Sequence, residues 1–125
     1  MSQVPGDLKY TKDHEWIREE SGEKFQIGIT DYAQGALGDI VYIQLPKVGA
    51  AVKEGAVCGE VESTKSVSEI YSPLTGTVVE VNTTLDKTPE LINQDPYGAG
   101  WIAIIETSAA PTDLLSATDY ENLTA

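Results

Sequence analysis

The sequence is poor in cysteine and histidine, and this scarcity excludes several kinds of site. A single cysteine, Cys58, rules out an intrachain disulfide, and its neighbours Val57 and Val61 indicate a small buried side chain in a strand. A single histidine, His14, leaves too few ligands for a His/Cys zinc site. No clustered loop of aspartates and glutamates offers a carboxylate metal site either. We therefore expect neither a disulfide nor a bound metal ion.

Long apolar runs and basic clusters are also missing. No stretch approaches the roughly 18–20 apolar residues that a membrane-spanning helix needs. The first residues, MSQVPGD, contain no basic stretch and no apolar core, and so resemble neither a secretory signal nor a transit peptide. These features favour a cytoplasmic, bacterial protein, although a mitochondrial protein already trimmed of its leader would look the same.

Positive charge is scarce: 8 lysines and arginines oppose 20 aspartates and glutamates, which leaves a net charge of −12. Binding to nucleic acid or to an anionic membrane needs a basic surface, so the sequence argues against both. The acidity has two open interpretations. It can serve solubility alone, or it can steer the protein toward basic faces of its partners.

With 125 residues, 41% of them hydrophobic, the chain is long enough for one core. We expect a single domain over residues 1–125, with a core of about 7–107 and a helical tail over 108–125. Glycines and β-branched runs predict a mainly β protein with a short helix near 31–37. The predicted strands are 14–19, 24–29, 39–45, 57–62, 66–71, 76–81 and 101–106, with a loop or short helix near 88–93.

Two further expectations concern how these strands pack. Both faces of strand 39–45 are mostly apolar, which predicts the core on one side and a covering element on the other. A weak internal repeat relates residues 46–62 to residues 73–106, since each half has a Pro/Gly entry and a strand that ends in glutamate. Two such halves facing each other would form a flattened β-sandwich.

The two halves of the repeat meet at a hairpin, in the segment GEVESTKSVSEIYSP that begins at Gly59. The two strands meet at Thr64 and Lys65, and without Gly or Asn there we expect a type I turn with the lysine outermost. Only small hydroxyl residues flank the lysine, and the nearest charges are Glu62 and Glu69. By turn chemistry alone, such a lysine is usually just a solvated side chain.

The GxVESxK pattern, followed by SP-x-x-G, resembles the lipoyl-attachment hairpin. Further segments resemble the glycine cleavage H-protein family: HEW from His14, IGITD from Ile27, LIN from Leu91 and PYGAGW from Pro96. They occur in the family's order and span roughly residues 7 to 123. Biotin carriers usually flank their lysine with methionines, and lipoyl domains of 2-oxoacid dehydrogenases lack the HEW segment. Both of these families therefore fit less well.

The resemblance implies a barrel-sandwich hybrid of the lipoyl-domain type, a non-catalytic carrier with lipoic acid joined by an amide to Lys65. Glu62 and Gly76 match the residues that lipoyl-attaching enzymes read. Asp13, Glu15 and Glu69 become candidates for polar contacts in a cleft where the lipoyl arm docks. Trp16 and Trp101 are expected to be core or cleft-wall residues.

The family also implies partners. These are glycine decarboxylase, a tetrahydrofolate-dependent aminomethyltransferase, dihydrolipoamide dehydrogenase and the lipoyl-attaching enzymes. Partners that reach one arm in turn suggest a monomer with transient contacts. Many members of the family carry a histidine after the Thr-Asp pair where this chain has Tyr32, which puts any role of a histidine at that position in doubt.

Three alternatives stay open. An enzyme is disfavoured, because the sequence has no GxSxG, no P-loop, no dinucleotide fingerprint and no second histidine. A carrier that relays lipoyl groups to other complexes could have almost the same sequence. A structural β module with an unmodified Lys65 is the third alternative.

Overall fold

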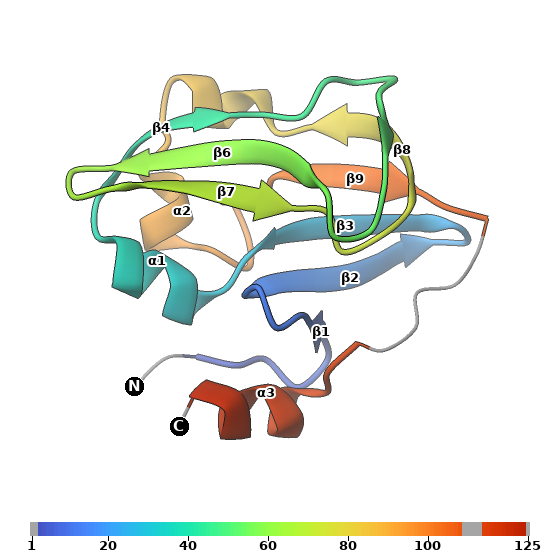
Figure 1. The fold of residues 1–125 in the computed structure, drawn as a ribbon, viewed down its shortest axis with the longest axis horizontal. Helices are drawn as coiled ribbons and strands as arrows, with labels where there is room; N and C mark the ends of the chain where they lie inside the picture. The colour runs from blue at the N-terminus through green and yellow to red at the C-terminus, as the bar shows by residue number, and fades with distance from the viewer. Residues whose placement is uncertain (1–2, 109–113, 125) are drawn as a thin grey trace.

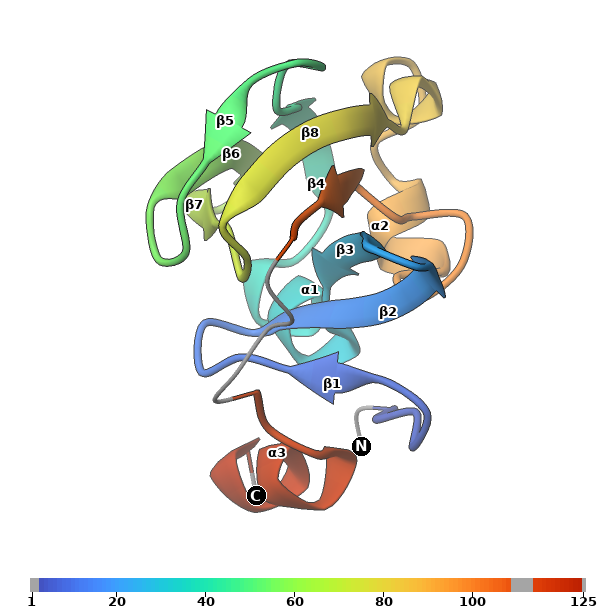
Figure 2. The same cartoon turned by 90° about the vertical axis from the view of Figure 1, so that its right-hand side faces the viewer.

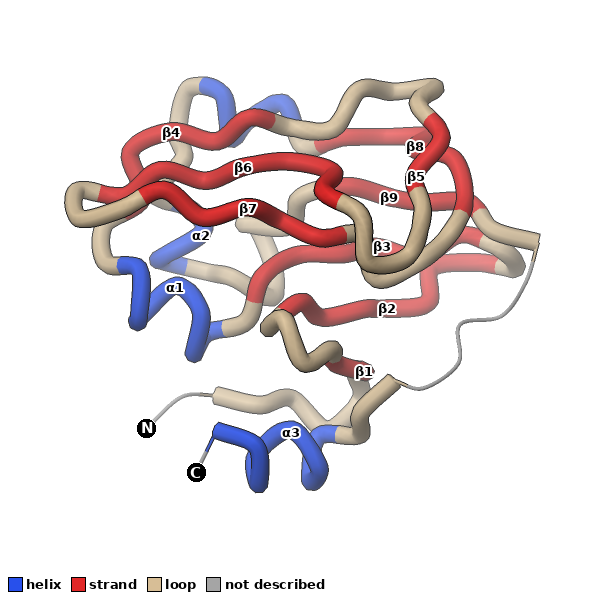
Figure 3. Tube along the Cα trace, in the orientation of Figure 1, coloured by secondary structure: helices blue, strands red, loops and turns tan. Residues whose placement is uncertain are grey.

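The strands form two antiparallel sheets in the computed structural model, which describes residues 3–108 and 114–124 (Figures 1 and 3). The larger sheet has six strands in the order β1-β2-β3-β9-β8-β5, and the smaller has three in the order β4-β6-β7. The strands are β1 (Lys9–Tyr10), β2 (Glu15–Ser21), β3 (Lys24–Ile29), β4 (Ile40–Gln44), β5 (Ala51–Val52), β6 (Val57–Ser63), β7 (Val67–Tyr71), β8 (Gly76–Val81) and β9 (Ala103–Glu106). The helices are α1 (Asp31–Leu37), the 3-10 turn η1 (Thr83–Asp86), α2 (Leu91–Gln94) and α3 (Ala117–Thr124).

The main core lies between the two sheets. Its buried side chains come from both: Ile17, Ile27, Ile29, Val78, Ala103 and Ile105 from the larger sheet, and Ile40, Ile43, Val61 and Ile70 from the smaller one. Each fully buried isoleucine contributes about 1.5–3 kcal/mol of hydrophobic stabilisation. This two-layer arrangement confirms the predicted mainly β sandwich with a short helix at α1.

A second, aromatic cluster lies under α3, which covers the β1–β2 end of the larger sheet (Figure 2). Its buried members are Leu8, Tyr10, Trp16, Tyr97 and Tyr120. The rings of Tyr10 and Tyr120 stack with centroids 4.8 Å apart, which ties α3 to β1. Helix α3 therefore packs on the outside of the sandwich through an aromatic contact.

The prediction that a covering element lies over the outer face of strand 39–45 is wrong. Val41 and Tyr42 are 53% and 50% exposed, whereas Ile40 and Ile43 are buried. The register with β6 shifts between Ile40 and Tyr42, so two successive residues reach the solvent side instead of alternating. A bulge of this kind cannot be predicted from the sequence of an apolar strand.

The short strands β1 and β5 and the turn η1 were not predicted, because two to four residues are too few to show a period. The predicted repeat does not divide the chain between the sheets: β5 pairs with β8 in the larger sheet, whereas β6 belongs to the smaller one. The predicted boundary between core and tail adjoins residues 109–113, which lie outside the described residues. None of the described helices has the length and apolar character that crossing a membrane requires.

Candidate functional site

Strands β6 and β7 pair up to the tip of a hairpin whose two outermost residues are Thr64 and Lys65. The backbone N–H of Ser63 donates to the carbonyl of Ser66 at 2.8 Å. The hydroxyl oxygen of Ser63 accepts hydrogen bonds from the N–H groups of Lys65 and Ser66, each at 3.1 Å. A serine side chain therefore closes this turn, a local bond that a hydroxyl residue makes readily in turns. The expected position of the lysine at the tip is found, and Lys65 is exposed.

The tip rests on the turn between α1 and β4. The N–H of Thr64 donates to the carbonyl of Asp39 at 3.1 Å. Gly38 ends α1 with φ of 86°, and a β-carbon built there would lie 3.0 Å from Cε and 3.7 Å from Nζ of Lys65. The absence of a side chain at Gly38 thus leaves room for the lysine to lie along the backbone. Within residues 3–108 and 114–124 no carboxylate forms an ion pair with the Lys65 ammonium.

The side chain of Asn93, on α2, ties this supporting turn to the rest of the fold. Its Nδ2 donates to the carbonyl of Gly38 at 2.9 Å, and its Oδ1 accepts from the N–H of Ile40 at 2.8 Å. Nδ2 also donates to Oε1 of Gln34 at 2.8 Å. The backbone beneath the exposed lysine is therefore held by the side chain of Asn93 on α2. The side chain of Gln34 on α1 holds Asn93 in turn.

A cleft of about 200 Å³ lies between α1 and the hairpin. Apolar side chains from both elements and from the end of β3 line it together with polar groups. The full lining is Asp13, His14, Glu15, Ile29, Tyr32, Ala33, Ala36, Leu37, Val61, Ser68, Glu69 and Ile70. Ser68 to Ile70 lie three to five residues beyond Lys65, which is about 10–17 Å along a strand. A group on the lysine nitrogen could reach this cleft if its arm spanned that length.

Glu15 is the buried carboxylate of the cleft, with 2% of its surface exposed. Its Oε1 accepts a hydrogen bond of 2.7 Å from the hydroxyl of Thr11. Burial raises the pKa of Glu15 to about 7, and the bond from Thr11 only partly opposes this rise. The carboxyl of Glu15 therefore changes charge near neutral pH, next to a cleft of the size of a small organic group.

His14 forms another wall of the cleft, and two tyrosines hold it. Its ring lies against that of Tyr32, with centroids 4.9 Å apart. Nδ1 of His14 lies 2.8 Å from the hydroxyl of Tyr120, which lies 2.7 Å from Oγ1 of Thr30. Burial lowers the pKa of His14, so the ring is neutral at physiological pH. Tyr32, which follows the Thr-Asp pair, thus packs on the ring of His14.

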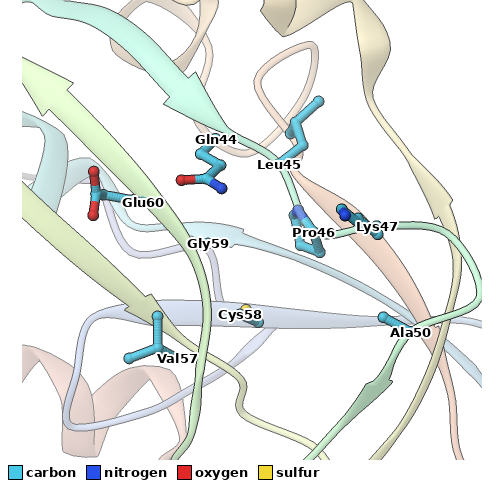
Figure 4. Close-up of a pocket in the computed structure, with 9 residues that line it drawn as sticks. All are labelled: Gln44, Leu45, Pro46, Lys47, Ala50, Val57, Cys58, Gly59 and Glu60. Carbon is cyan, nitrogen blue, oxygen red and sulfur yellow. The ribbon is translucent and has the colours of Figure 1, made fainter.

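Of two further hollows, one lies away from the cleft and one adjoins it. One, of about 310 Å³, lies between the start of β6 and the segment after β4, with Gln44, Val57 and Glu60 on its wall (Figure 4). Cys58 also lines it, but burial raises the pKa of the thiol to about 11, so it stays protonated and poorly nucleophilic. The other, of about 230 Å³, shares Asp13 and Glu15 with the cleft and is also lined by Pro73.

The predicted residues fall into two groups. Asp13, Glu15 and Glu69 all line the cleft, although they come from different elements. Glu62 lies outside it, on β6. Gly76 begins β8 in the larger sheet, whereas the hairpin belongs to the smaller sheet, and β8 starts at the end of the sandwich away from the hairpin tip (Figure 1).

Packing alone explains why position 76 is a glycine. A β-carbon there would lie 2.2 Å from the carbonyl oxygen of Glu106, a contact that backbone cannot relieve cheaply. Trp16 is buried in the aromatic cluster and is absent from the cleft lining, and Trp101 packs against the same cluster. Both tryptophans are therefore structural residues, which was one of the two expectations for them.

Sequence reasoning did not identify Gly38 and Tyr120 as parts of the site. Gly38 was read only as the end of a helix, and its contact with Lys65 depends on tertiary structure. Tyr120 lies 106 residues from His14 along the chain, and no local pattern links the two. Asn93 lies in the LIN segment that resembles the family, but no role was predicted for this residue from the sequence.

The chain matches the family model described as glycine cleavage H-protein over residues 8–125. It is 56% identical over 110 residues to the glycine cleavage system H protein of Mycobacterium tuberculosis strain H37Ra, which covers 88% of this chain and 82% of that protein. It is 53% identical over 122 residues to the H protein of Xylella fastidiosa strain M12, with 96% and 93% covered.

Its fold is similar to the crystal structure of a glycine cleavage system H protein from Mycobacterium marinum. The TM-score is 0.89 at 45% sequence identity, and the match covers 97% of this chain and 98% of the other. The family model alone covers nearly the whole chain, and these relatives agree with it over the same residues. The chain belongs to the glycine cleavage H-protein family.

Proposed function

We propose that this chain is the lipoyl carrier of a glycine cleavage system, with lipoic acid attached through an amide to Lys65. The observation that carries the proposal is the exposed amine at the tip of a rigid hairpin, without an ion-pair partner among the described residues. Membership of the H-protein family supports it, since the family acts in this system. The protein itself is then a non-catalytic component.

The residues at the tip fit a lipoyl group. The amide would form when the Nζ of Lys65, having lost a proton, displaces the leaving group of an activated lipoyl carboxyl. The exposed side chain leaves Nζ accessible, and Glu62, three residues before it, is the candidate that a lipoyl-attaching enzyme reads. Gly76 was proposed for the same role. Its place in the larger sheet, away from the hairpin tip, favours an indirect effect through the fold.

The arm would add reach to the hairpin. The lysine and lipoyl chain together span on the order of 10–15 Å, which matches the distance along β7 to the cleft. When bound, the lipoyl group supplies a dithiolane that can be opened to two thiols, and a thiol can carry a one-carbon unit. In this role the chain accepts an aminomethyl group at glycine decarboxylase and delivers it to the aminomethyltransferase. Dihydrolipoamide dehydrogenase then restores the disulfide.

The cleft would protect the loaded arm. An aminomethyl thio-adduct hydrolyses in water, and a cleft with apolar walls from α1 and β6 excludes water from it. The adduct carries an ammonium group, and Glu15, Asp13 and Glu69 offer carboxylates around the same cleft. His14 is neutral and therefore adds no repulsion toward that charge. The arm would leave the cleft when a partner binds.

The remaining elements of the proposal follow from the system. Three enzymes must use one arm in turn, which favours a monomer with transient contacts, located in the cytoplasm of a bacterium. Tethering raises the effective concentration of the dithiolane at a docked partner to about the mM range. The acidic charge of −12 would speed encounters with basic partner faces.

Lys65→Arg tests the proposal directly. The variant should give no glycine-dependent exchange of CO₂ with purified glycine decarboxylase after incubation with lipoate and an attaching enzyme, because arginine cannot form the amide. Its melting temperature should stay within about 2 °C of wild type, since the side chain is exposed. Lys47→Arg, at another exposed lysine, is the matched control and should keep full exchange.

Two outcomes would contradict the proposal. Exchange that survives in Lys65→Arg would move the attachment site elsewhere. A lipoylated wild-type protein that supports no exchange would favour the relay of lipoyl groups to other complexes.

A further inference from the structure

An apolar patch surrounds a carboxylate on the outer face of the smaller sheet, beside the hairpin tip. Strand pairing aligns Tyr42, Glu62 and Val67 in one row across β4, β6 and β7, and Val41 precedes Tyr42. Val41, Tyr42 and Val67 are 53%, 50% and 57% exposed. We call Val41, Tyr42, Glu62 and Val67 the tip patch. It holds three of the seven large hydrophobic side chains that are exposed in the described part of the chain, all close to Lys65.

The local backbone produces this patch. In a regular strand Val41 and Tyr42 would point to opposite faces, and one of them would be covered. The register shift between Ile40 and Tyr42 leaves both exposed. Bulges that re-aim side chains are frequent beside functional sites. Exposed apolar residues that gather rather than scatter mark places where another molecule binds.

The charged side chains in the two strand rows of this face are all carboxylates. Glu62 pairs across the sheet with Tyr42 and Val67, so no basic side chain stands beside it in its row. Glu60 occupies the next row, between Gln44 and Glu69. Figure 4 shows the side chains of Glu60 and Gln44 on neighbouring strands at the edge of the adjoining hollow. A partner that covers this face must present an apolar centre with lysine or arginine beside it.

We propose that the tip patch is the surface on which the enzyme that attaches lipoate to Lys65 docks, through an apolar seat for Tyr42 and Val67 and a basic side chain for Glu62. This rests on the proposed function and adds the contact surface to it. Tyrosine is a frequent anchor at the centre of such interfaces, and the two valines would complete its apolar surround.

Distance favours this partner over the others. Before attachment there is no arm, so the reacting carboxyl must come within bonding distance of Nζ. Glu62 and Val67 lie three and two residues from Lys65, within about 10 Å along their strands. An interface of about 800 Å² per partner extends farther than that in every direction. Enzymes that act on the finished arm can dock on the order of 10–15 Å away.

The test measures the rate at which a purified lipoate-attaching enzyme modifies the full-length protein. For the variant with both Tyr42→Ser and Val67→Ser, we expect kcat/KM to fall at least about 10-fold, mainly through KM, because anchors of an interface cost this much when truncated. Melting temperatures should stay near that of wild type. Val48→Ser and Leu123→Ser, at positions 61% and 51% exposed and outside the patch, should be modified at the wild-type rate.

Two further variants, Val67→Lys and Glu62→Gln, test the charge pattern. Val67→Lys should slow modification more than the serine variant, because it places a positive charge against the basic partner surface. Glu62→Gln should flatten the dependence of KM on salt. Wild-type rates in both Tyr42→Ser/Val67→Ser and Val67→Lys would overturn the docking surface and leave the proposed function intact. A wild-type protein that the enzyme never modifies would overturn both.

Discussion

Glu15 is buried in the fold and also lines the cleft. It lies at the start of β2, where the turn over residues 11–14 returns the chain and the hydroxyl of Thr11 caps the carboxylate. The sequence suggested its place near an arm-docking cleft by resemblance alone. Its burial could not be predicted, because it depends on packing between β2 and the hairpin.

The raised pKa of Glu15 makes stability depend on pH. Its ordinary pKa of 4.5 applies to the unfolded chain, and about 7 to the folded one. Between these values the folded protein holds a proton that the unfolded chain has lost, so stability falls as pH rises from about 4.5 to about 7. The loss should be on the order of 3 kcal/mol. Glu15→Gln should remove this part of the pH dependence, as measured by urea unfolding at pH 5 and pH 8.

The exposed Asp13→Asn provides the control for Glu15→Gln, since it removes a neighbouring charge without removing a buried one. It should keep most of the slope of stability with pH, because burial raises the pKa of Glu15 more than the charge of Asp13 does. If Glu15→Gln kept the wild-type slope instead, the carboxyl would not titrate in the window that its burial implies.

Gly76→Ala should destabilise the fold by about 1–3 kcal/mol, because the new methyl group meets the backbone of Glu106. Gly35→Ala is the matched control: a β-carbon there meets nothing within 4 Å, and helix propensity favours alanine by up to about 1 kcal/mol. Thermal unfolding measures both. A Gly76→Ala protein as stable as wild type but slow to be lipoylated would restore a direct recognition role.

Among the elements, α3 has the most indirect link to the site. It lies on the outside of the sandwich, yet the hydroxyl of Tyr120 reaches His14 and the N-cap residue Thr30. Burial raises the pKa of Tyr120 to about 12, so its hydroxyl keeps its proton and stays a donor. The helix therefore holds one wall of the cleft and the start of α1 together.

Tyr120→Phe should cost about 1–3 kcal/mol of stability, because the half-buried Nδ1 of His14 and the buried Oγ1 of Thr30 each lose a hydrogen bond. It should also change the NMR titration of His14, whose Nδ1 loses its hydrogen bond. Leu123→Ala, at an exposed position of the same helix, should change neither. An unchanged His14 titration in Tyr120→Phe would show that the contact does not position the ring.

Long strands with clear alternation were predictable, and so was the helix α1 between Thr30 and Gly38. The hairpin of β6 and β7 was placed within one residue at each end. The outer face of β4 was not predictable, because whether an apolar residue is covered depends on a bulge and on what packs beyond it. The wrong expectation there concerns the same residues that now form the tip patch.

At the scale of the whole molecule, the sandwich gives the hairpin two different sides. One side faces α1 and the cleft, where Val61 and Ser68 contribute to the lining. The other side faces solvent, where Tyr42, Glu62 and Val67 lie in one row. We infer that the lipoyl arm lies in the cleft on the first side, and that the enzyme that attaches lipoate docks on the second side. Lys65 lies in the turn between β6 and β7, so its side chain is accessible from both sides of the hairpin.

The attachment of lipoate to Lys65 is tested by the mass of the intact protein after incubation with lipoate, ATP and a lipoate-attaching enzyme, followed by peptide mapping. We expect a gain of one lipoyl group, located on the peptide that contains Lys65, and loss of tryptic cleavage after that residue. An unchanged mass, or a lipoyl group on any other lysine, would contradict it.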